Sequence, residues 1–386
     1  MKILYTNFHT EPGGGHATYI LSLYGELRKR HQIHIAVPQS CALELRAPNI
    51  PPEVLHGLEY PGKLKELPRI VVNGLKLRAL IQQNQYDVIH VNGSPDHRLV
   101  FLATMGLRHK PAIVYTKHNS FPLSRNRLSQ NRYRLHTDHI IVVCGRQKGM
   151  FEDVGVHEKH ISVIKNGVDT AYFSPYSAQQ RSEIRTRLGL AENDLVLVSV
   201  AGTALHKGWQ YLVEAASRVL SKNIKIIVVG DTPGKDVQAR HVAAFNMTER
   251  VIFPGPMADV RPYIAAGDIG FVLSNAVETI SFACREMMAM GKPALVSNFA
   301  CLPENVVPSK SGWVVEVGDV AAIRDVIEWA LDHRGQLCAM GETARLQAVN
   351  EFGVAQFARE TESVYEEVVA KRRKFGAPTC AGNPPN

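Results

Sequence analysis

The feature that most constrains the fold of this chain is a regular alternation of short apolar runs with amphipathic helical patterns. In the first half, runs rich in Val and Ile occupy residues 2–8, 33–37, 87–91, 112–116, 139–144 and 161–165. Between two of these runs, residues 15–29 place apolar side chains at helical spacing. Continuous apolar strands separated by helices are typical of a parallel sheet that is covered on both faces.

The alternation restarts after a link at residues 166–180, which carries Gly, Pro and polar side chains. The second set of apolar runs occupies residues 194–200, 225–230, 251–255, 269–274, 293–297 and 312–316. The sequence therefore predicts an α/β protein with two Rossmann-like parallel-sheet domains that face a central cleft. We expect the domains at residues 1–170 and 171–354. A final helix is expected at 355–373, and a tail at 374–386 without periodicity is expected to be disordered.

Composition excludes several classes of protein. The chain has 386 residues, 45% of them apolar and 21% charged, which is enough for a large core. No apolar stretch reaches the roughly 18–20 residues of a membrane span, and the first apolar run is too short for a signal peptide. The six cysteines lack CxxC spacing, which argues against a zinc site or a disulfide framework and favours a reducing compartment, here the cytoplasm.

Positive charge is concentrated in the first half of the chain. Residues 1–170 hold 22 Lys and Arg against 13 Asp and Glu, whereas the remainder holds 22 against 23. This asymmetry favours an anionic partner, such as a phosphorylated substrate, nucleic acid or an anionic membrane, although a merely soluble basic surface is the alternative. Residues 69–81 are amphipathic and basic, and we expect an ordinary packed helix there in preference to one that lies on a membrane.

In open parallel sheets, ligands bind at the carboxyl ends of the strands, so the chemistry is expected in the loops that follow them. The loop "EPGGGHATYI" places Gly14 and Gly15 between the first strand and the first helix, where the backbone can approach an anion. It lacks the GxGxxG spacing of a dinucleotide site, and a flexible loop without a ligand is the alternative. His118 follows the run at 112–116, and Lys207 begins a helix after the run at 194–200, where it can pair with a diphosphate.

The stretch "ETISFACRE" contains two carboxylates in an apolar setting. Glu278 falls in a loop, Ser281 resembles a helix N-cap, and Glu286 lies inside the helix. A buried carboxylate needs a partner, which ligand hydroxyls or a structural salt bridge with Arg285 would supply equally well. Glu304 follows Pro303 after another strand end, where helix capping is the alternative role.

The order of these motifs resembles that of the retaining, nucleotide-sugar-dependent glycosyltransferases of family 4, which have the GT-B fold, and of their bacterial lipopolysaccharide and polysaccharide type in particular. The resemblance extends over residues 1–373 and rests on the following elements: the glycine loop at 13–15, His118, "NGVD" at 166–169, Lys207 with Gly208, the Glu-x7-Glu pair, "GKP" at 291–293 and "PE" at 303–304.

The resemblance implies a role for each matching residue. Glu278 would contact hydroxyls of the donor sugar, Glu286 would hold the ribose, and Lys207 would neutralise the diphosphate. His118 would lie near the donor sugar, and Glu304 would support the loop around it. The glycines would approach the phosphates or the acceptor, "NGVD" would be the hinge, and the last helix would cross back to the first domain. Ser281 and Thr203 are expected at the donor site as well.

Two departures from the family pattern concern the donor site. Thr203 stands where the family usually has a phosphate-binding arginine, so either the phosphate clamp is weaker or another residue, such as Arg285, His206 or an arginine of the first domain, substitutes. The usual glycine between the two glutamates is replaced by Thr279, Ile280 and Ser281. These departures affect the identity of the donor more than the fold.

The resemblance implies a retaining transferase that moves a hexose or an N-acetylaminosugar from a nucleotide sugar, expected to be a UDP-sugar, to a glycan or lipid-linked acceptor in cell-surface polysaccharide or lipopolysaccharide synthesis. No metal, no cofactor and no nucleic acid are expected. We expect a cytoplasmic protein that lies peripherally at the inner face of the membrane. The alternatives are a non-catalytic nucleotide-sugar binder, and an epimerase or phosphorylase of the same fold.

Overall fold

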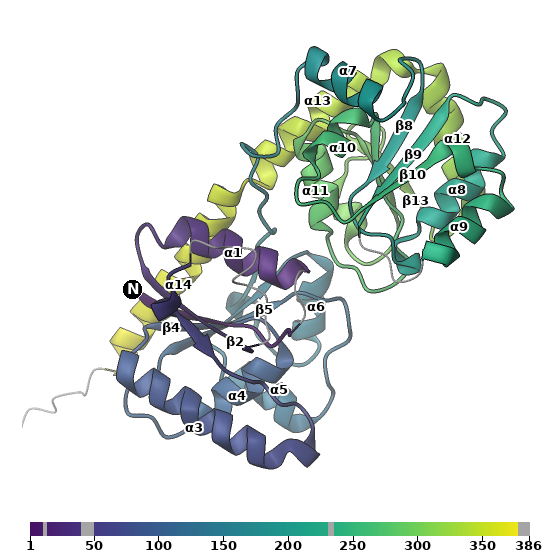
Figure 1. Cartoon of the computed structure of the whole chain (residues 1–386). Coiled ribbons are helices and arrows are strands. Elements are labelled where there is room, and N and C mark those ends of the chain that lie inside the picture. Colours follow the sequence, from purple (N-terminus) through teal and green to yellow (C-terminus); the bar gives the residue numbers. More distant parts are fainter. Residues whose placement is uncertain (11–13, 40–49, 231–234, 377–386) are drawn as a thin grey trace, which may run out of the picture.

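The structure is a computed structural model that describes residues 1–10, 14–39, 50–230 and 235–376. It has two α/β domains, each built on a parallel sheet, which confirms the predicted fold class (Figure 1). The tail from residue 377, the glycine loop at 11–13 and Cys41 lie outside the described residues. Among the described residues, no helix combines the length and the apolar character that a bilayer span needs.

The first domain contains a sheet of seven parallel strands in the order β3-β2-β1-β4-β5-β6-β7. Its strands are β1 (Lys2–Thr6), β2 (Gln32–Val37), β3 (Leu55–Gly57), β4 (Val88–Val91), β5 (Ala112–Lys117), β6 (His139–Val142) and β7 (Ile161–Val163). Its helices are α1 (Gly15–Leu27), α3 (Leu67–Asn84), α4 (Ser94–Thr104), α5 (Arg127–Leu135) and α6 (Arg146–Glu152). Among the strands that the structure describes in this domain, only the short edge strand β3 has no counterpart among the predicted strands.

The second domain contains a sheet of six parallel strands in the order β10-β9-β8-β11-β12-β13. Its strands are β8 (Leu195–Ser199), β9 (Ile224–Val229), β10 (Val251–Gly255), β11 (Ile269–Val272), β12 (Ala294–Ser297) and β13 (Gly312–Val315). Its helices are α7 (Ala178–Arg187), α8 (Trp209–Ser217), α9 (Lys235–Ala244), α10 (Arg261–Ala266), α11 (Phe282–Ala289), α12 (Val320–Asp332) and α13 (Arg334–Glu351).

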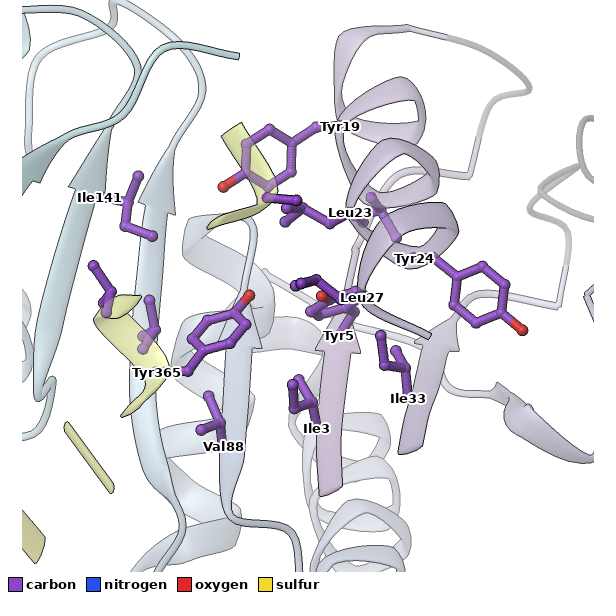
Figure 2. Packing of buried hydrophobic residues seen from close by; sticks show 14 of the residues in the cluster. Ile3, Tyr5, Tyr19, Leu23, Tyr24, Leu27, Ile33, Val88, Ile141 and Tyr365 are labelled. Atoms are coloured by element: carbon purple, nitrogen blue, oxygen red, sulfur yellow. The ribbon is translucent and has the colours of Figure 1, made fainter. Parts of the chain in front are cut away.

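The last helix, α14 (Val354–Gly376), leaves the second domain and packs against the first, next to α1 (Figure 1). Tyr365 of this helix lies in one apolar cluster with Tyr5 and Tyr19, and Figure 2 shows its ring among side chains of the first sheet. Burial of so large an apolar surface holds the helix to the first domain. The helix continues past the predicted end at 373, so the prediction of a tail from residue 374 is wrong by three residues.

The chain crosses between the domains at two adjacent places. The amide of Val168 donates to the carbonyl of Phe352 at 2.7 Å, and the amide of Val354 donates to the carbonyl of Val168 at 3.0 Å. A Cβ on Gly167 would lie 2.6 Å from Cα of Val354, so the glycine of "NGVD" is required by close contact of the two crossings.

The prediction that the cysteines do not pair is wrong. Cys144, which follows β6 in the first domain, forms a disulfide with Cys301 of the second domain, 157 residues away along the chain. The two thiols are brought together only by the contact between the domains, so sequence spacing gives no sign of the pair. The described free cysteines are Cys284, which is buried, and Cys338, which is exposed.

Candidate functional site

The centre of the candidate site is an ion pair at the carboxyl ends of two strands of the second domain. Nζ of Lys207 donates to Oε2 of Glu278 at 2.9 Å, and the side chains are 20% and 11% exposed, so the pair is only partly in contact with solvent. Oγ of Ser274 also donates to Oε2 of Glu278, at 3.3 Å. The pair therefore presents one ammonium group and one carboxylate together at the edge of the sheet where ligands bind.

Lys207 is held in place by the glycine that follows it. It ends the short 3-10 helix η4 (Leu205–Lys207), and Gly208 has a φ of 76° in the left-handed region. A Cβ at position 208 would lie 1.9 Å from the carbonyl oxygen of Leu273, directly after β11. Because only glycine allows this approach, the pair Lys207-Gly208 brings the ammonium group against the loop that carries Glu278.

The loop from β11 to α11 has an unusual backbone. Val277 and Ser281, on either side of Glu278, have φ values of 48° and 54°. Oγ of Ser281 accepts the amide of Cys284 and so caps α11, and Oε1 of Glu278 accepts the amide of Thr279 at 3.1 Å. Two non-glycine residues in the left-handed region are strained, and such strain is characteristic of ligand-binding loops.

His118 faces this loop from the first domain. It follows β5, and its Nε2 donates to Oδ1 of Asn92 at 2.9 Å. Its ring also lies 4.3 Å from that of His16 and 4.4 Å from that of Tyr19, between centroids. Burial, together with the neighbouring His16 and His90, lowers the pKa of His118 well below its usual range, so the imidazole is neutral at neutral pH.

Two hydrogen bonds join the domains at this point. Oγ1 of Thr279 donates to the carbonyl of His118 at 2.7 Å, and Oγ of Ser120 donates to the carbonyl of Glu278 at 2.9 Å. The structure therefore places the predicted residues Lys207, Glu278 and His118 around one region of the contact between the domains.

The described part of the glycine loop also faces the second domain. Gly14 is the N-cap of α1 and has a φ of 87°. A Cβ on Gly15 would lie 3.5 Å from the ring of Phe282 in α11, so the first turn of α1 lies against the first turn of α11. The N-termini of these two helices therefore lie side by side where the domains meet, and a helix N-terminus is a position at which backbone amides can bind an anion.

The other predicted residues lie at different depths around the site. Glu286 is half-buried on α11. Thr203 is buried, and its carbonyl accepts Nε1 of Trp209 at 2.7 Å. Glu304, in η6 (Leu302–Asn305), accepts the backbone amides of Gly145 and Arg146 at 2.9 and 3.2 Å, so it caps α6 of the first domain.

Arg285 is not available to replace the missing phosphate-binding arginine. Its Nη1 donates to the carbonyl of Asn166 at 2.6 Å, and its Nε donates to Oδ1 of Asn305 at 2.8 Å. Its guanidinium carbon also lies 4.2 Å from the centre of the Phe352 ring, and the side chain is fully buried. Arg285 therefore ties α11 to the interdomain link, and burial lowers its pKa to about 10.

Sequence reasoning missed four residues that support the site: Asn92, His16, Ser120 and Thr279. Asn92 follows β4 directly, so the rule that ligands bind at strand carboxyl ends was sufficient to find it. The roles of Ser120 and Thr279 depend on the contact between the domains, which no sequence pattern indicates.

One group of described residues has the composition of a metal site. The ligand atoms of Cys144, Cys301 and Glu304 lie within 4.8 Å of one another. The two sulfurs are bonded to each other, however, and the carboxylate already accepts two amides, so this group does not fit a metal in the present state.

Comparison with known proteins agrees with this geometry. The model described as Glycosyltransferase Family 4 matches residues 13–172, and the model described as Glycosyl transferases group 1 matches residues 180–347. N-acetyl-alpha-D-glucosaminyl L-malate synthase of Bacillus anthracis is 23% identical over 303 residues, which cover 76% of this chain and 78% of that protein.

Solved structures show the same fold. The structure of Anabaena Alr3699/HepE in complex with UDP superposes with a TM-score of 0.82 at 20% identity, covering 95% of this chain and 100% of that chain. The same protein in complex with UDP-glucose gives a TM-score of 0.80 with the same coverage. The two family models together extend from residue 13 to residue 347 and both describe glycosyltransferases, so this chain is a glycosyltransferase of the GT-B fold whose first domain matches family 4.

Proposed function

We propose that this glycosyltransferase uses a UDP-sugar, retains the anomeric configuration of the transferred hexose or N-acetylaminosugar, and needs no metal. The observation that carries the proposal is the ion pair of Lys207 and Glu278 at the strand ends, opposite His118. UDP is favoured because the structurally similar Anabaena Alr3699/HepE has been solved with UDP and with UDP-glucose.

Each residue of the site has a separate task in this proposal. Lys207 and the N-termini of α1 and α11 stabilise the negative charge that develops on the departing diphosphate, which is the task that a metal would otherwise perform. Glu278 accepts hydrogen bonds from sugar hydroxyls, and Glu286 holds the ribose. His118 is neutral, and because its Nε2 already donates to Asn92, its other ring nitrogen accepts a hydrogen bond from a sugar hydroxyl.

The acceptor in this proposal is a glycan or a lipid-linked saccharide of a cell-surface polysaccharide or lipopolysaccharide, reached at the inner face of the cytoplasmic membrane. The support is the surface of α3, which buries Leu77 and Ile81 but leaves an apolar row in contact with solvent. The row consists of Leu67, Val71, Val72 and Leu75, all between 51% and 62% exposed. An apolar row beside Arg69 and Lys76 suits an anionic lipid surface.

A thermal-shift screen with UDP-, GDP-, ADP- and CMP-sugars tests the donor. A ligand that binds only the folded protein raises the unfolding midpoint by mass action, and we expect this for UDP-sugars. If the shift appears only with another nucleotide, the UDP assignment is wrong. Donor hydrolysis by the parent and by Glu278→Ala then separates the enzyme from the alternative, a non-catalytic binder, because only an enzyme loses turnover in the variant.

Flotation with anionic liposomes tests the membrane surface. We expect association that weakens with salt and is reduced in Val71→Ser/Leu75→Ser, whereas the exposed Leu346→Ser in the second domain serves as the matched control. Absence of salt-sensitive flotation contradicts the membrane proposal without affecting the donor site.

A further inference from the structure

The cysteine pair lies where the domains meet, next to the candidate site. Cys144 directly follows Val143 at the end of β6, and Cys301 directly precedes η6. Both cysteines are 1% exposed and form one apolar cluster with Val143 and Ile280, which belongs to the loop after Glu278. A disulfide in this cluster therefore connects the two domains where they are in contact.

Polar contacts around the pair also cross from one domain to the other. Glu304 caps α6 through the amides of Gly145 and Arg146, and Nη1 of Arg146 donates to the carbonyl of Ala300 at 2.9 Å. The amide of Cys301 donates to the carbonyl of Thr279 at 3.1 Å. One hydrogen bond therefore separates the disulfide from the loop that carries Glu278.

We propose that Cys144 and Cys301 are a reversible thiol–disulfide exchange site whose oxidised form locks the two domains together. The chain already crosses between the domains at Val168 and at Gly353, and the disulfide adds a third covalent connection at the end of a neighbouring strand. A connection away from the two adjacent crossings restricts the relative rotation of the domains. The locking itself does not depend on the proposed function. Its consequence for turnover does depend on it, because product release needs the domains to separate.

The exchange is balanced with a low-molecular-weight disulfide, RSSR, as the oxidant. The thiolate of one cysteine attacks RSSR, which forms a mixed disulfide and releases one RS⁻. When the domains approach, the second thiolate attacks the protein sulfur of the mixed disulfide, which forms the Cys144–Cys301 bond and releases the second RS⁻. The two thiol protons of the protein end on the two RSH molecules, and RSSR is reduced while the cysteine pair is oxidised.

Burial of both sulfurs in the closed arrangement determines when exchange occurs. A reagent reaches a thiol that is 1% exposed only while the domains are apart, so exchange reports on opening. Cys284 is a matched control, because it is also fully buried but lies inside the second domain, on α11. Cys338 is the exposed control.

The first experiment incubates the full-length protein in reduced or oxidised glutathione and then maps alkylated and cross-linked peptides by mass spectrometry. In oxidised glutathione we expect a peptide that joins Cys144 to Cys301, and neither of these two cysteines is alkylated in the denatured protein, whereas the exposed Cys338 can carry a glutathione adduct. Equal alkylation of both cysteines under the two conditions overturns the proposal, and so does a stable glutathione adduct on either one.

The second experiment measures hydrogen exchange of residues 118–120 and 279–281 in the same two samples. Oxidation is expected to slow exchange there by about five-fold or more in the parent and in Cys338→Ser, but not in Cys144→Ala or Cys301→Ala. Alanine is chosen because it leaves an apolar side chain in the cluster, and each cysteine is replaced separately. If both variants fold poorly, the comparison of the reduced with the oxidised parent still tests the lock. Unchanged exchange in the oxidised parent overturns the lock.

Turnover measured on the same samples distinguishes the two proposals. Slower hydrogen exchange together with turnover that returns on reduction supports both. Slower exchange in a protein that has no transferase activity even when reduced leaves the lock supported and contradicts the proposed function.

Discussion

The two domains share one architecture but differ in the side chains that they contribute to the candidate site. Thirteen of the 16 histidines lie in residues 1–170, whereas all three tryptophans, Trp209, Trp313 and Trp329, lie in the second domain. Where the domains meet, the second domain presents an ion pair, and the first presents imidazole rings and an asparagine. The second domain thus supplies charge to the site, and the first supplies neutral hydrogen-bonding groups.

This difference shows that similar sheets can give a site two halves with different chemistry. The half with Lys207 depends on electrostatic stabilisation, which is strong where water is partly excluded. The half with His118 depends on imidazoles that burial keeps uncharged, so it is the half that acid disturbs.

The largest expected difference between the domains is their resistance to acid: the first domain should unfold at a higher pH than the second. Burial lowers the pKa of His90 to about 3 and that of His139 to about 4. The unfolded chain binds protons at these groups near pH 6.5 while the folded domain does not, so stability present above pH 6.5 is lost as the pH falls. Between pH 6.5 and 5, each such histidine lowers the free energy of unfolding of the first domain by roughly 2 kcal/mol.

Asp96 opposes this trend, because burial raises its pKa to about 7 and its contribution to stability is lost as the pH rises from about 4 to 7. Because several histidines act in the opposite direction, this single carboxyl group does not reverse the trend. Tryptophan fluorescence reports on the second domain, and hydrogen exchange of β4 and β5 reports on the first. If the fluorescence changes at higher pH than the exchange, the comparison between the domains is wrong.

Replacement of the charged group in the second domain should reduce kcat more than replacement of the neutral group in the first. We expect Lys207→Ala to reduce kcat by about 10²–10³, the usual effect of removing one stabilising group from a developing anion. His118→Ala should reduce it by only about ten-fold, because a neutral imidazole contributes a single uncharged hydrogen bond. The exposed Lys222→Ala is the control, and a larger effect at His118 contradicts the assignment of charge to the second domain.

The glycines at the two halves of the site should also differ. Gly208→Ala should destabilise the protein by about 2–4 kcal/mol, because its Cβ meets the carbonyl of Leu273 and its φ is positive. Gly14→Ala should cost only about 1–2 kcal/mol, because position 14 has a positive φ but open space around it. Urea unfolding measures both values, and equal losses mean that the contact at Gly208 does not position Lys207.

The smallest expected effect concerns the contact between the domains. Glu304→Gln removes the charge that caps α6 and should lower stability by about 0.5–1 kcal/mol. Thermal unfolding of this variant is compared with that of Glu328→Gln, whose side chain is 48% exposed on α12. A loss as small as that of the control shows that Glu304 does not hold the domains together.

Much of the fold could be predicted because strands buried on both faces leave continuous apolar runs in the sequence. Every predicted strand is present, whereas β3 was missed because "LHG" is short and only partly buried. Positions such as Lys207, Glu278 and His118 could be found because they follow strands. The task of Arg285 could not, because its partners Asn166 and Asn305 lie far from it in sequence.

The sequence by itself determined that the chain forms two parallel-sheet domains and that its polar motifs lie at strand carboxyl ends, because local periodicity and strand direction suffice for both. The tertiary structure alone decided which groups meet between the domains: Thr279 with the carbonyl of His118, Glu304 with the N-terminus of α6, and Cys144 with Cys301. Each of these contacts joins residues from different domains, and the relative position of two domains is set by surface complementarity, which local sequence patterns do not encode.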